Sequence, residues 1–528
     1  MATQTEWKKF CQYYLENSKY DFSIDISKVN FKDSALKQFE SKFKLSLQAM
    51  KKLEKGSIAN PDENRMVGHY WLRNSKIAPK SELKTAINST NKKIKLFTSK
   101  ILKGMIKGSK GKFKNLLLAG IGGSALGPQF IDNALKPASK GLTTYFLDNT
   151  DPDGIDRTLD SLKKEFGQTL VVVISKSGGT KETRNCLLEI QNRYKKAKID
   201  FNKHAVAVTG EGSNLYNTAS EEKWVDIFPM WDWVGGRTSV MSAVGLLPAA
   251  LAGYQIDNLL KGAAEMDEWT RSASLKKNPA GLLSAMWYII GEGKGTKDMV
   301  ILPYKDRLEL FSKYLQQLIM ESLGKKSDLD GKDVFQGIAV YGNKGSTDQH
   351  AYIQQLRDGI NNFFATFIEV KNSRSGRSMQ VEKQTTTGDY LEGFLLGTRQ
   401  ALHESNRESI TISIDEVNEL QVGRLIALFE RAVGFYAHYV NINAYHQPGV
   451  EAGKIAAQSI LNLKNDLLNA MKSESKAQTA DAWAKTLKQE KQVETVFKLL
   501  NYLSANSENK VKLVGPKNGP KSKFSLKK

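Results

Sequence analysis

A short polar segment, Ser175–Thr180, offers three hydroxyls, one ammonium group and two glycines. It follows Leu170–Ile174, a run of β-branched and apolar residues that predicts a buried strand, and we expect a helix to open near Lys181. The first N–H groups of a helix and its dipole favour a bound anion. The segment lacks P-loop spacing and could also be a simple capped turn. As a phosphate site it would use the side chains of Ser175, Lys176, Ser177 and Thr180.

A second glycine-rich segment, Gly120–Pro128, satisfies the pattern GxGxx[GA], and Asp148 ends the next apolar run. That pattern is typical of dinucleotide-binding units, so an NAD-dependent dehydrogenase is one interpretation. A dinucleotide has one pyrophosphate and needs one such loop, so this interpretation gives no role to the Ser175–Thr180 loop. Two such loops suit a phosphorylated sugar better, with Gly123 and Ser124 near its hydroxyls.

Two further residues could move a proton beside a carbonyl group. Arg237 follows two glycines and could stabilise a developing oxyanion, because a guanidinium group stays charged. Glu321 follows an apolar series, Leu315, Leu318 and Ile319, so partial desolvation could make it a usable base. Each has a plain alternative, namely a structural ion pair for the arginine and a solvated helix end for the glutamate.

Three polar residues further along the chain add to this set. His350 follows a glycine-rich turn in which Ser346 or Thr347 could cap a helix, and histidine titrates near neutral pH. Gln447 and Lys454 are seven residues apart and could share one face of a helix that starts near position 449. A packing histidine and a surface lysine are the corresponding structural alternatives.

Apolar runs that alternate with helical patterns predict two α/β sheets in tandem, which would present their loops at the carboxyl ends of the strands. The first set comprises Leu116–Ala119, Thr144–Leu147, Leu170–Ile174, Ala205–Val208 and Val225–Phe228. The second set comprises Met299–Leu302, Gly337–Tyr341, Phe363–Glu369 and Ile410–Ile414. The segments before and after these sets are predicted to be helical.

Composition excludes several classes of protein. No apolar stretch approaches the ~18 residues that span a bilayer, so we expect no membrane association. Only two cysteines occur, and no His/Cys cluster, which predicts a reducing, cytoplasmic location and no metal site or cofactor. The net charge is +21, with lysine-rich stretches at 92–114 and 504–528. Neither contains an arginine, so we do not expect nucleic-acid binding, and we expect the second stretch to be a disordered tail.

The order of the polar segments resembles the phosphoglucose isomerase family, and the nearest resemblance is to bacterial enzymes of the cyanobacterial kind. The resemblance spans about residues 65 to 460 and rests on 120–128, 175–183, 234–239, 320–325, 342–350 and 447–454. It implies two doubly wound parallel-sheet sugar-isomerase (SIS) domains with helical extensions. The expected boundaries are 1–100 for the N-terminal segment, 101–275 and 276–445 for the two domains, 446–503 for C-terminal helices and 504–528 for the tail.

The resemblance also implies a reaction, the isomerisation of glucose 6-phosphate to fructose 6-phosphate through a cis-enediolate, in glycolysis and gluconeogenesis. Glu321 would move the proton, Arg237 would stabilise the enediolate, and His350 and Lys454 would assist ring opening. The 6-phosphate would lie on the Ser175–Thr180 loop, and Gln447 would line the site. A homodimer is implied, with His350 reaching the partner's site.

The sequence departs from many family members at His446, at Pro448 and around Lys344–Gln349, which bears on the contacts to the sugar ring. Three other functions remain open from sequence alone. They are a non-catalytic sugar-phosphate sensor, the NAD-dependent dehydrogenase and a basic nucleic-acid binder.

Overall fold

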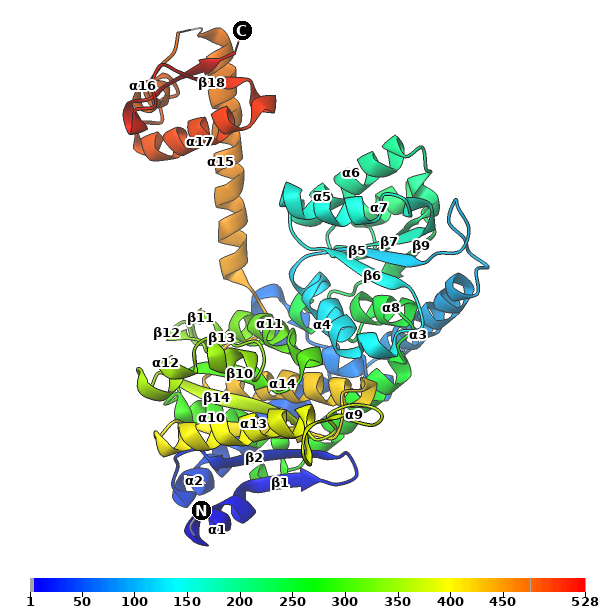
Figure 1. Ribbon diagram of the computed structural model, residues 1–528, viewed down its shortest axis with the longest axis vertical. Coiled ribbons are helices and arrows are strands. Elements are labelled where there is room, and N and C mark those ends of the chain that lie inside the picture. The colour runs from blue at the N-terminus through cyan, green and yellow to red at the C-terminus, as the bar shows by residue number, and fades with distance from the viewer. Residues whose placement is uncertain (1–3, 475, 528) are drawn as a thin grey trace. The chain divides into compact units, whose positions relative to one another are not determined.

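The computed structural model describes residues 4–474 and 476–527 and divides the chain into two compact units. The first unit ends at His446 and contains the five-stranded and the six-stranded sheet. The second unit begins at Gln447 (Figure 1). Each unit has a hydrophobic core of its own.

The first sheet is parallel throughout, in the order β6-β5-β7-β8-β9. Its strands are β5 (Asn115–Ala119), β6 (Thr143–Leu147), β7 (Thr169–Ile174), β8 (Ala205–Thr209) and β9 (Asp226–Pro229). Figure 1 shows one face covered by α5 (Pro152–Ser161), α6 (Lys181–Lys196) and α7 (Asn214–Glu221), and the other by α3 (Ser81–Leu102), α4 (Leu126–Leu135) and α8 (Ala243–Leu251). Alternate residues of the strands enter the two cores, and the five predicted strands are confirmed to within two residues.

The second sheet has the order β1-β2-β17-β14-β10-β13. Its parallel strands are β10 (Asp298–Pro303), β13 (Val340–Tyr341), β14 (Phe363–Val370) and β17 (Ser409–Ile414). The helices packed against it are α10 (Pro279–Ile290), α12 (Ile353–Asp358), α13 (Thr387–Glu404) and α14 (Glu419–Tyr439). The strand predicted over 337–341 is real but shorter, because only its last two residues pair with β10.

The prediction of an all-helical N-terminal segment is wrong, because the described part of residues 1–100 contains four strands, two of which join the second sheet. The segment contains α1 (Gln4–Tyr13), α2 (Asp33–Glu54) and α3, but β1 (Tyr14–Asn17) and β2 (Phe22–Lys28) extend the second sheet. β2 pairs antiparallel with β17 and β1 pairs antiparallel with β2. The strand signal was present in the sequence, because Phe22, Ile24 and Ile26 alternate with Ser23, Asp25 and Ser27, although both faces of β2 are buried.

The prediction of a disordered C-terminal tail is also wrong. The second unit consists of α15 (Pro448–Ser473), α16 (Ala480–Thr486), α17 (Val493–Ala505) and the antiparallel pair β18 (Val511–Val514) and β19 (Lys523–Leu526). Val511 and Phe524 are fully buried against Trp483, whose indole N–H donates to the Phe524 carbonyl at 3.2 Å. The lysines dominate the composition of 504–528, but these few apolar side chains close a small core, so 447–528 is one unit.

A buried ion network ties the N-terminal segment to α14 and to α9 (Ile256–Trp269). Asp267 of α9 accepts hydrogen bonds from the guanidinium groups of Arg73 and Arg431 at 2.7–2.9 Å. Arg73 also pairs with Glu430, and all four side chains are at most 2% exposed. The two guanidinium charges hold the pKa of Asp267 well below its usual range, against the effect of burial.

Short two-stranded ladders complete the first unit. They are β3 (Ile58–Asn60) with β4 (Arg65–Met66), β11 (Lys325–Ser327) with β12 (Asp333–Gln336), and β15 (Gln380–Glu382) with β16 (Thr385–Thr386). In the part of the chain that the structure describes, every helix is too short or too polar to cross a lipid bilayer.

Candidate active site

The polar loop after β7 forms an open cradle at the start of α6. Ser175 is buried and its hydroxyl lies 3.4 Å from that of Thr180, whereas Ser177 is exposed. Gly178 has φ +67°, and a Cβ there would lie 2.3 Å from the backbone nitrogen of Leu215. Among the described residues, no side chain caps the first N–H groups of α6. The predicted strand, loop and helix are therefore present, with the helix N-terminus available to an anion.

Lys176 is held on this loop by the segment after β9. Its ammonium group lies 3.2 Å from Asp232 Oδ1 and also donates to the Asp232 and Val234 carbonyls. Burial lowers the pKa of Lys176, and the charge of Asp232 opposes that shift. Asp232 was not singled out from the sequence. Its position between two tryptophans, whose rings stack at 4.8 Å, was the available signal.

The second sheet has an equivalent loop that is closed to an anion. The orders β6-β5-β7-β8 and β13-β10-β14-β17 correspond, so the loop after β14 takes the place of the loop after β7. There the helix is α13, and its first turn is closed by a capping box in which Asp389 accepts from the Thr386 N–H at 2.7 Å. A carboxylate of the chain thus already occupies this N-terminus, while that of α6 stays open.

The glycine-rich loop after β5 packs against the loop that carries Arg237. A Cβ on Gly123 would lie 2.1 Å from the Gly236 carbonyl oxygen, and the Ser239 hydroxyl donates to the Gly123 carbonyl at 3.4 Å. Gly122 has φ +56° and faces Gln317, on the π-helical segment Gln316–Glu321 that follows α11 (Phe311–Leu315). These contacts bring together two loops and a helical segment that the sequence separates by up to two hundred residues.

Arg237 and Glu321 meet at this junction. Arg237 Nη2 lies 3.5 Å from Glu321 Oε1, with the two side chains 5% and 18% exposed. The guanidinium also donates to the carbonyls of Ala444 and His446 at 3.0 and 3.1 Å. Burial lowers the pKa of Arg237, and Glu321 opposes that shift. A fixed cation beside a partly buried carboxylate suits proton transfer next to a developing oxyanion.

Lys325 lies beside this pair and was not singled out from the sequence. Its ammonium group donates to the Glu321 carbonyl at 2.6 Å, and the residue is 5% exposed. Burial, with the charge of Arg237, lowers its pKa to about 7, while Glu321 and Asp62 act in the opposite direction. The spacing from Glu321 to Lys325 was visible in the sequence, but the burial of the lysine was not.

The remaining predicted residues lie elsewhere. His350 is exposed and ends a short 3-10 helix, Thr347–His350, whose N-cap position is Ser346, one of the two expected. Within the described chain no side chain caps this helix, and the α-helix α12 starts only at Ile353. Ser124 lies on the same short turn as Gly123. α15 starts at Pro448, one residue before the expected start near position 449, and Gln447 is its N-cap residue. Lys454 is on α15, but its side chain lies outside the described part of the structure.

Within the described ranges, no cluster of three or more His, Cys, Asp or Glu side chains has the arrangement of a metal site. The candidate site is therefore defined by the open cradle at α6 and by the junction of the loops that carry Gly123, Arg237 and Glu321.

Comparison with known proteins places this arrangement in a family. A family model described as phosphoglucose isomerase matches residues 21–484. A glucose-6-phosphate isomerase from Citrifermentans bemidjiense is 53% identical over 513 residues, covering 97% of each chain. The relative from the cyanobacterium Gloeothece citriformis is 53% identical over 508 residues, covering 96% of each chain. A chloroplastic glucose-6-phosphate isomerase from Arabidopsis thaliana is 54% identical over 95% of this chain and 83% of its own.

Solved structures agree at the level of the fold. The crystal structure of a glucose-6-phosphate isomerase from Chlamydia trachomatis aligns with a TM-score of 0.80 at 22% identity, over 94% of each chain. The family model covers most of the chain, and relatives more than half identical cover nearly all of it. This chain therefore belongs to the phosphoglucose isomerase family.

Proposed function

We propose that this protein interconverts glucose 6-phosphate and fructose 6-phosphate, as its relatives are named for doing. The observation that carries the proposal is the partly buried Arg237–Glu321 pair, where two loops meet a helical segment in a chain of this family. The reaction is an aldose–ketose isomerisation, which serves both glycolysis and gluconeogenesis. It needs a base that can remove and return a proton on neighbouring carbons.

Glu321 is proposed to be that base. Its carboxylate takes the proton from C2 of the open-chain aldose, the C2–H electrons form the C1–C2 double bond, and the O1 oxygen gains charge. Return of the proton to C1, with a proton moving from the O2 hydroxyl to O1, gives the ketose. Arg237 stabilises the charge on the cis-enediolate, because a buried guanidinium is already in place when the charge develops.

The 6-phosphate is proposed to bind the cradle after β7, through Ser175, Lys176, Ser177 and Thr180. Two observations support this: within the described chain the N-terminus of α6 has no side-chain cap, and its counterpart on α13 is closed by Asp389. Phosphate binding at a distance from the reacting carbons supplies binding energy that orients them. Gly123 and Ser124 would then face the sugar, and the two sheets would form the two sugar-isomerase domains.

The test is a coupled assay on fructose 6-phosphate with Glu321→Gln. The variant should lose about 10²–10⁴-fold in kcat, while sugar-phosphate binding by calorimetry stays within about threefold. Glu309→Gln is the matched control, since it removes an exposed carboxylate preceding the same helix, 3.5 Å from Lys344. Near-normal turnover by Glu321→Gln would overturn the base assignment.

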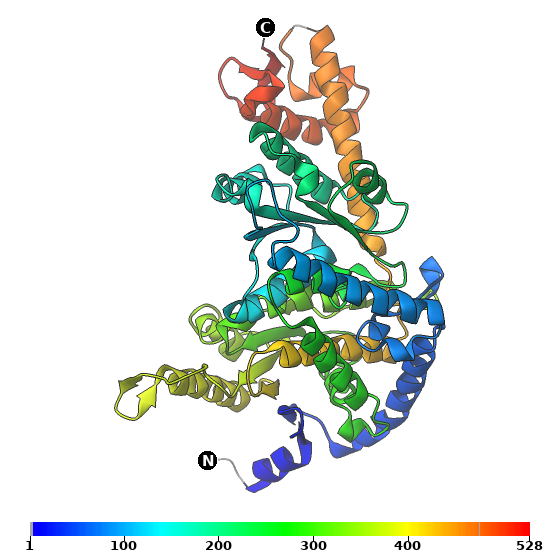
Figure 2. The ribbon, with the colours of Figure 1, turned by 90° about the vertical axis from the view of Figure 1, so that its right-hand side faces the viewer.

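We also propose a homodimer in which His350 completes the partner's site, where it and Lys454 assist ring opening and Gln447 lines the sugar. His350 is exposed, and the β15–β16 hairpin projects, with the start of α13, from the rest of the first unit (Figure 2). This extension carries exposed apolar side chains, Met379, Val381, Tyr390, Phe394 and Leu396. Such a surface is typical of a protein interface.

Mixed dimers can test the shared site. Glu321→Gln and His350→Ala are each expected to be nearly inactive alone. If one site uses Glu321 of one chain and His350 of the other, co-expressed mixed dimers contain one intact site and recover activity. No recovery in purified mixed dimers would show that each site is built from a single chain.

The free thiols Cys11 and Cys186 support a reducing location such as the cytoplasm.

A further inference from the structure

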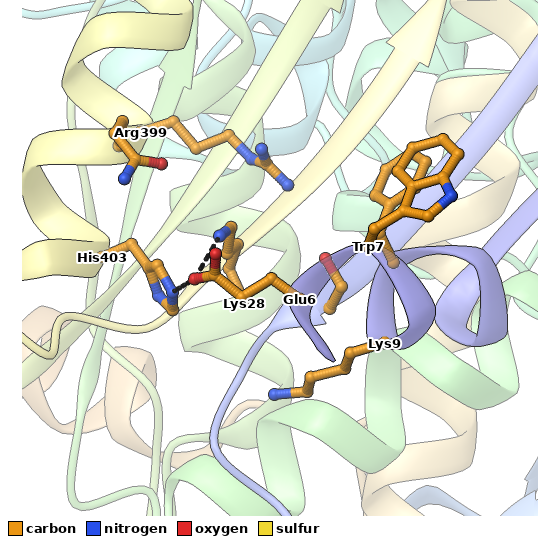
Figure 3. Close-up of a pocket in the computed structure, with 9 residues that line it drawn as sticks. Glu6, Trp7, Lys9, Lys28, Arg399 and His403 are labelled. Atoms are coloured by element: carbon orange, nitrogen blue, oxygen red, sulfur yellow. Dashed lines mark hydrogen bonds and ion pairs between the residues drawn. The ribbon is translucent and has the colours of Figure 1, made fainter. Parts of the chain in front are cut away.

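A second polar cavity lies at the outer edge of the second sheet, on elements that do not carry the Arg237–Glu321 pair. It has a volume of about 250 Å³ and is enclosed by α1, the end of β2 and α13. Figure 3 shows side chains from these three elements meeting around it. The volume is slightly below the usual range for ligand sites, so it would suit a small metabolite and exclude a dinucleotide.

Three cationic side chains and one histidine line the cavity. Arg399 and His403 are four residues apart on one face of α13, and Lys28 enters from β2. Lys9 adds a further ammonium group, whose pKa is lowered by burial and by the charge of Lys28. Two carboxylates face these groups: Asp25 pairs with Arg399, and Glu6 lies between Lys28 and His403.

Glu6 already occupies the place of an anion. One of its oxygens lies 3.1 Å from His403 Nε2 and 3.7 Å from Lys28 Nζ (Figure 3). Glu6 is on the short α1, and its side chain is 36% exposed. A carboxylate on a peripheral helix can be exchanged for that of a ligand at little cost to the core. The position of Glu6 therefore indicates that the cavity can bind an anionic group such as a carboxylate.

Two polar atoms at the cavity remain without partners. Ser27 is 3% exposed, and its hydroxyl makes no hydrogen bond with any described residue. Arg399 Nε is buried and equally unpaired within the described chain, although its Nη2 bonds Asp25. An unpaired buried donor is costly, and a bound acceptor would recover that cost. Both residues line the cavity, so a single ligand could satisfy them.

An aromatic surface forms another side of the cavity. Trp7 and Phe10 line it, with their rings stacked at a centroid distance of 5.5 Å, and Trp7 is 61% exposed. An exposed tryptophan beside a cationic cluster provides apolar contact for a ligand whose other end is charged.

From these observations we propose that the cavity is a second ligand site, which binds a small organic anion. Its phosphate or carboxylate group is held by Arg399, Lys28 and His403, with the Ser27 hydroxyl, in place of the Glu6 carboxylate. Its apolar part lies against Trp7 and Phe10. The inference does not depend on the proposed isomerase activity, because none of these residues belongs to that site.

The test uses phenyl phosphate, which combines an anion with a flat apolar ring. The protein is labelled with ¹⁵N in its tryptophan indoles, and Trp7→Phe assigns the Trp7 signal among the eight tryptophans. Phenyl phosphate should shift the Trp7 signal saturably. Signals of Trp231 and Trp233, assigned in the same way, report separately on binding at the Lys176 loop, next to which they lie.

The variants give effects of opposite sign. Arg399→Gln and His403→Gln should each weaken binding by about tenfold or more, through loss of a charge-assisted hydrogen bond. Glu6→Gln should tighten binding several-fold, because it removes the competing carboxylate. Lys37→Gln, a charge change on the exposed face of α2, should have no effect. Circular dichroism confirms folding, and His403→Gln keeps the test valid if loss of the Asp25 partner unfolds Arg399→Gln.

Any one of the following results would overturn the proposal. One is a Trp7 signal that does not respond to phenyl phosphate. Another is an equal response to benzyl alcohol, which would show apolar contact without anion recognition. The last is binding that is unchanged in both Arg399→Gln and His403→Gln, or weakened by Glu6→Gln.

Discussion

Gly123→Ala tests whether close packing between the two glycine loops sets the geometry of the site. The new Cβ would lie 2.1 Å from the Gly236 carbonyl oxygen, against about 3.4 Å for ordinary contact, so one loop must move by about 1.3 Å. Both neighbours are backbone, and Arg237 directly follows Gly236. A displacement of about 1 Å at a positioning residue can cost about 10²-fold in rate. We therefore expect kcat/KM on fructose 6-phosphate to fall about 100-fold, with a loss of about 1–3 kcal/mol in stability.

The matched control is Gly236→Ala, on the other side of the same contact. A Cβ on Gly236 would meet no atom within 4 Å, and its backbone does not lie in the left-handed region. Both variants are measured in the coupled assay and by urea unfolding. Equal activity of Gly123→Ala and Gly236→Ala would refute the reasoning, because the two differ in that one collision.

Three further variants extend the test to the cradle and the core. Gly178→Ala should raise KM more than its control, Gly212→Ala. Both glycines have φ near +70°, but of the two only Gly178 would place a Cβ against backbone, at 2.3 Å. Equal KM values in the coupled assay would argue against a phosphate site at the cradle. Asp267→Asn should lower the free energy of unfolding at neutral pH by about 3–5 kcal/mol, since two buried guanidinium groups lose their partner. Its folded pKa is depressed, so its stabilisation is lost as pH falls, and the deficit measured by urea unfolding should shrink towards about pH 3. Lys325 has a pKa of about 7 against an ordinary 10.5, so its buried charge destabilises below pH 7 and this cost fades as pH rises. Lys325→Met should therefore gain more stability over wild type at about pH 6 than at about pH 9, and an equal gain at both would show that the lysine is not desolvated.

The parallel strands were predictable because each is a short apolar run with a polar loop at its carboxyl end. Leu170–Ile174 is an example, since a continuous run of apolar and β-branched residues is typical of a strand buried on both faces of a parallel sheet. β2 also carries a strand pattern, since Phe22, Ile24 and Ile26 alternate with polar residues. Its partner β17 lies almost four hundred residues away along the chain, so the local sequence does not show that the two strands pair. The prediction of a disordered C-terminal tail was wrong because composition alone does not show how the apolar residues pack. Its lysines outnumber its apolar residues, and only the packing of Phe524 on Trp483 shows that those few are enough.

The sequence by itself determined which residues could do the chemistry. The hydroxyls and lysine of 175–180, the guanidinium of Arg237 and the carboxylate of Glu321 carry their reactivity in their side chains, and their order along the chain indicated the family. The tertiary structure decided which of them meet. Only folding places Arg237 3.5 Å from Glu321, buries Lys325 beside them, and leaves α6 open while Asp389 closes α13. The physical reason is that desolvation and charge pairing depend on distances across the fold, which the local pattern of a sequence does not contain.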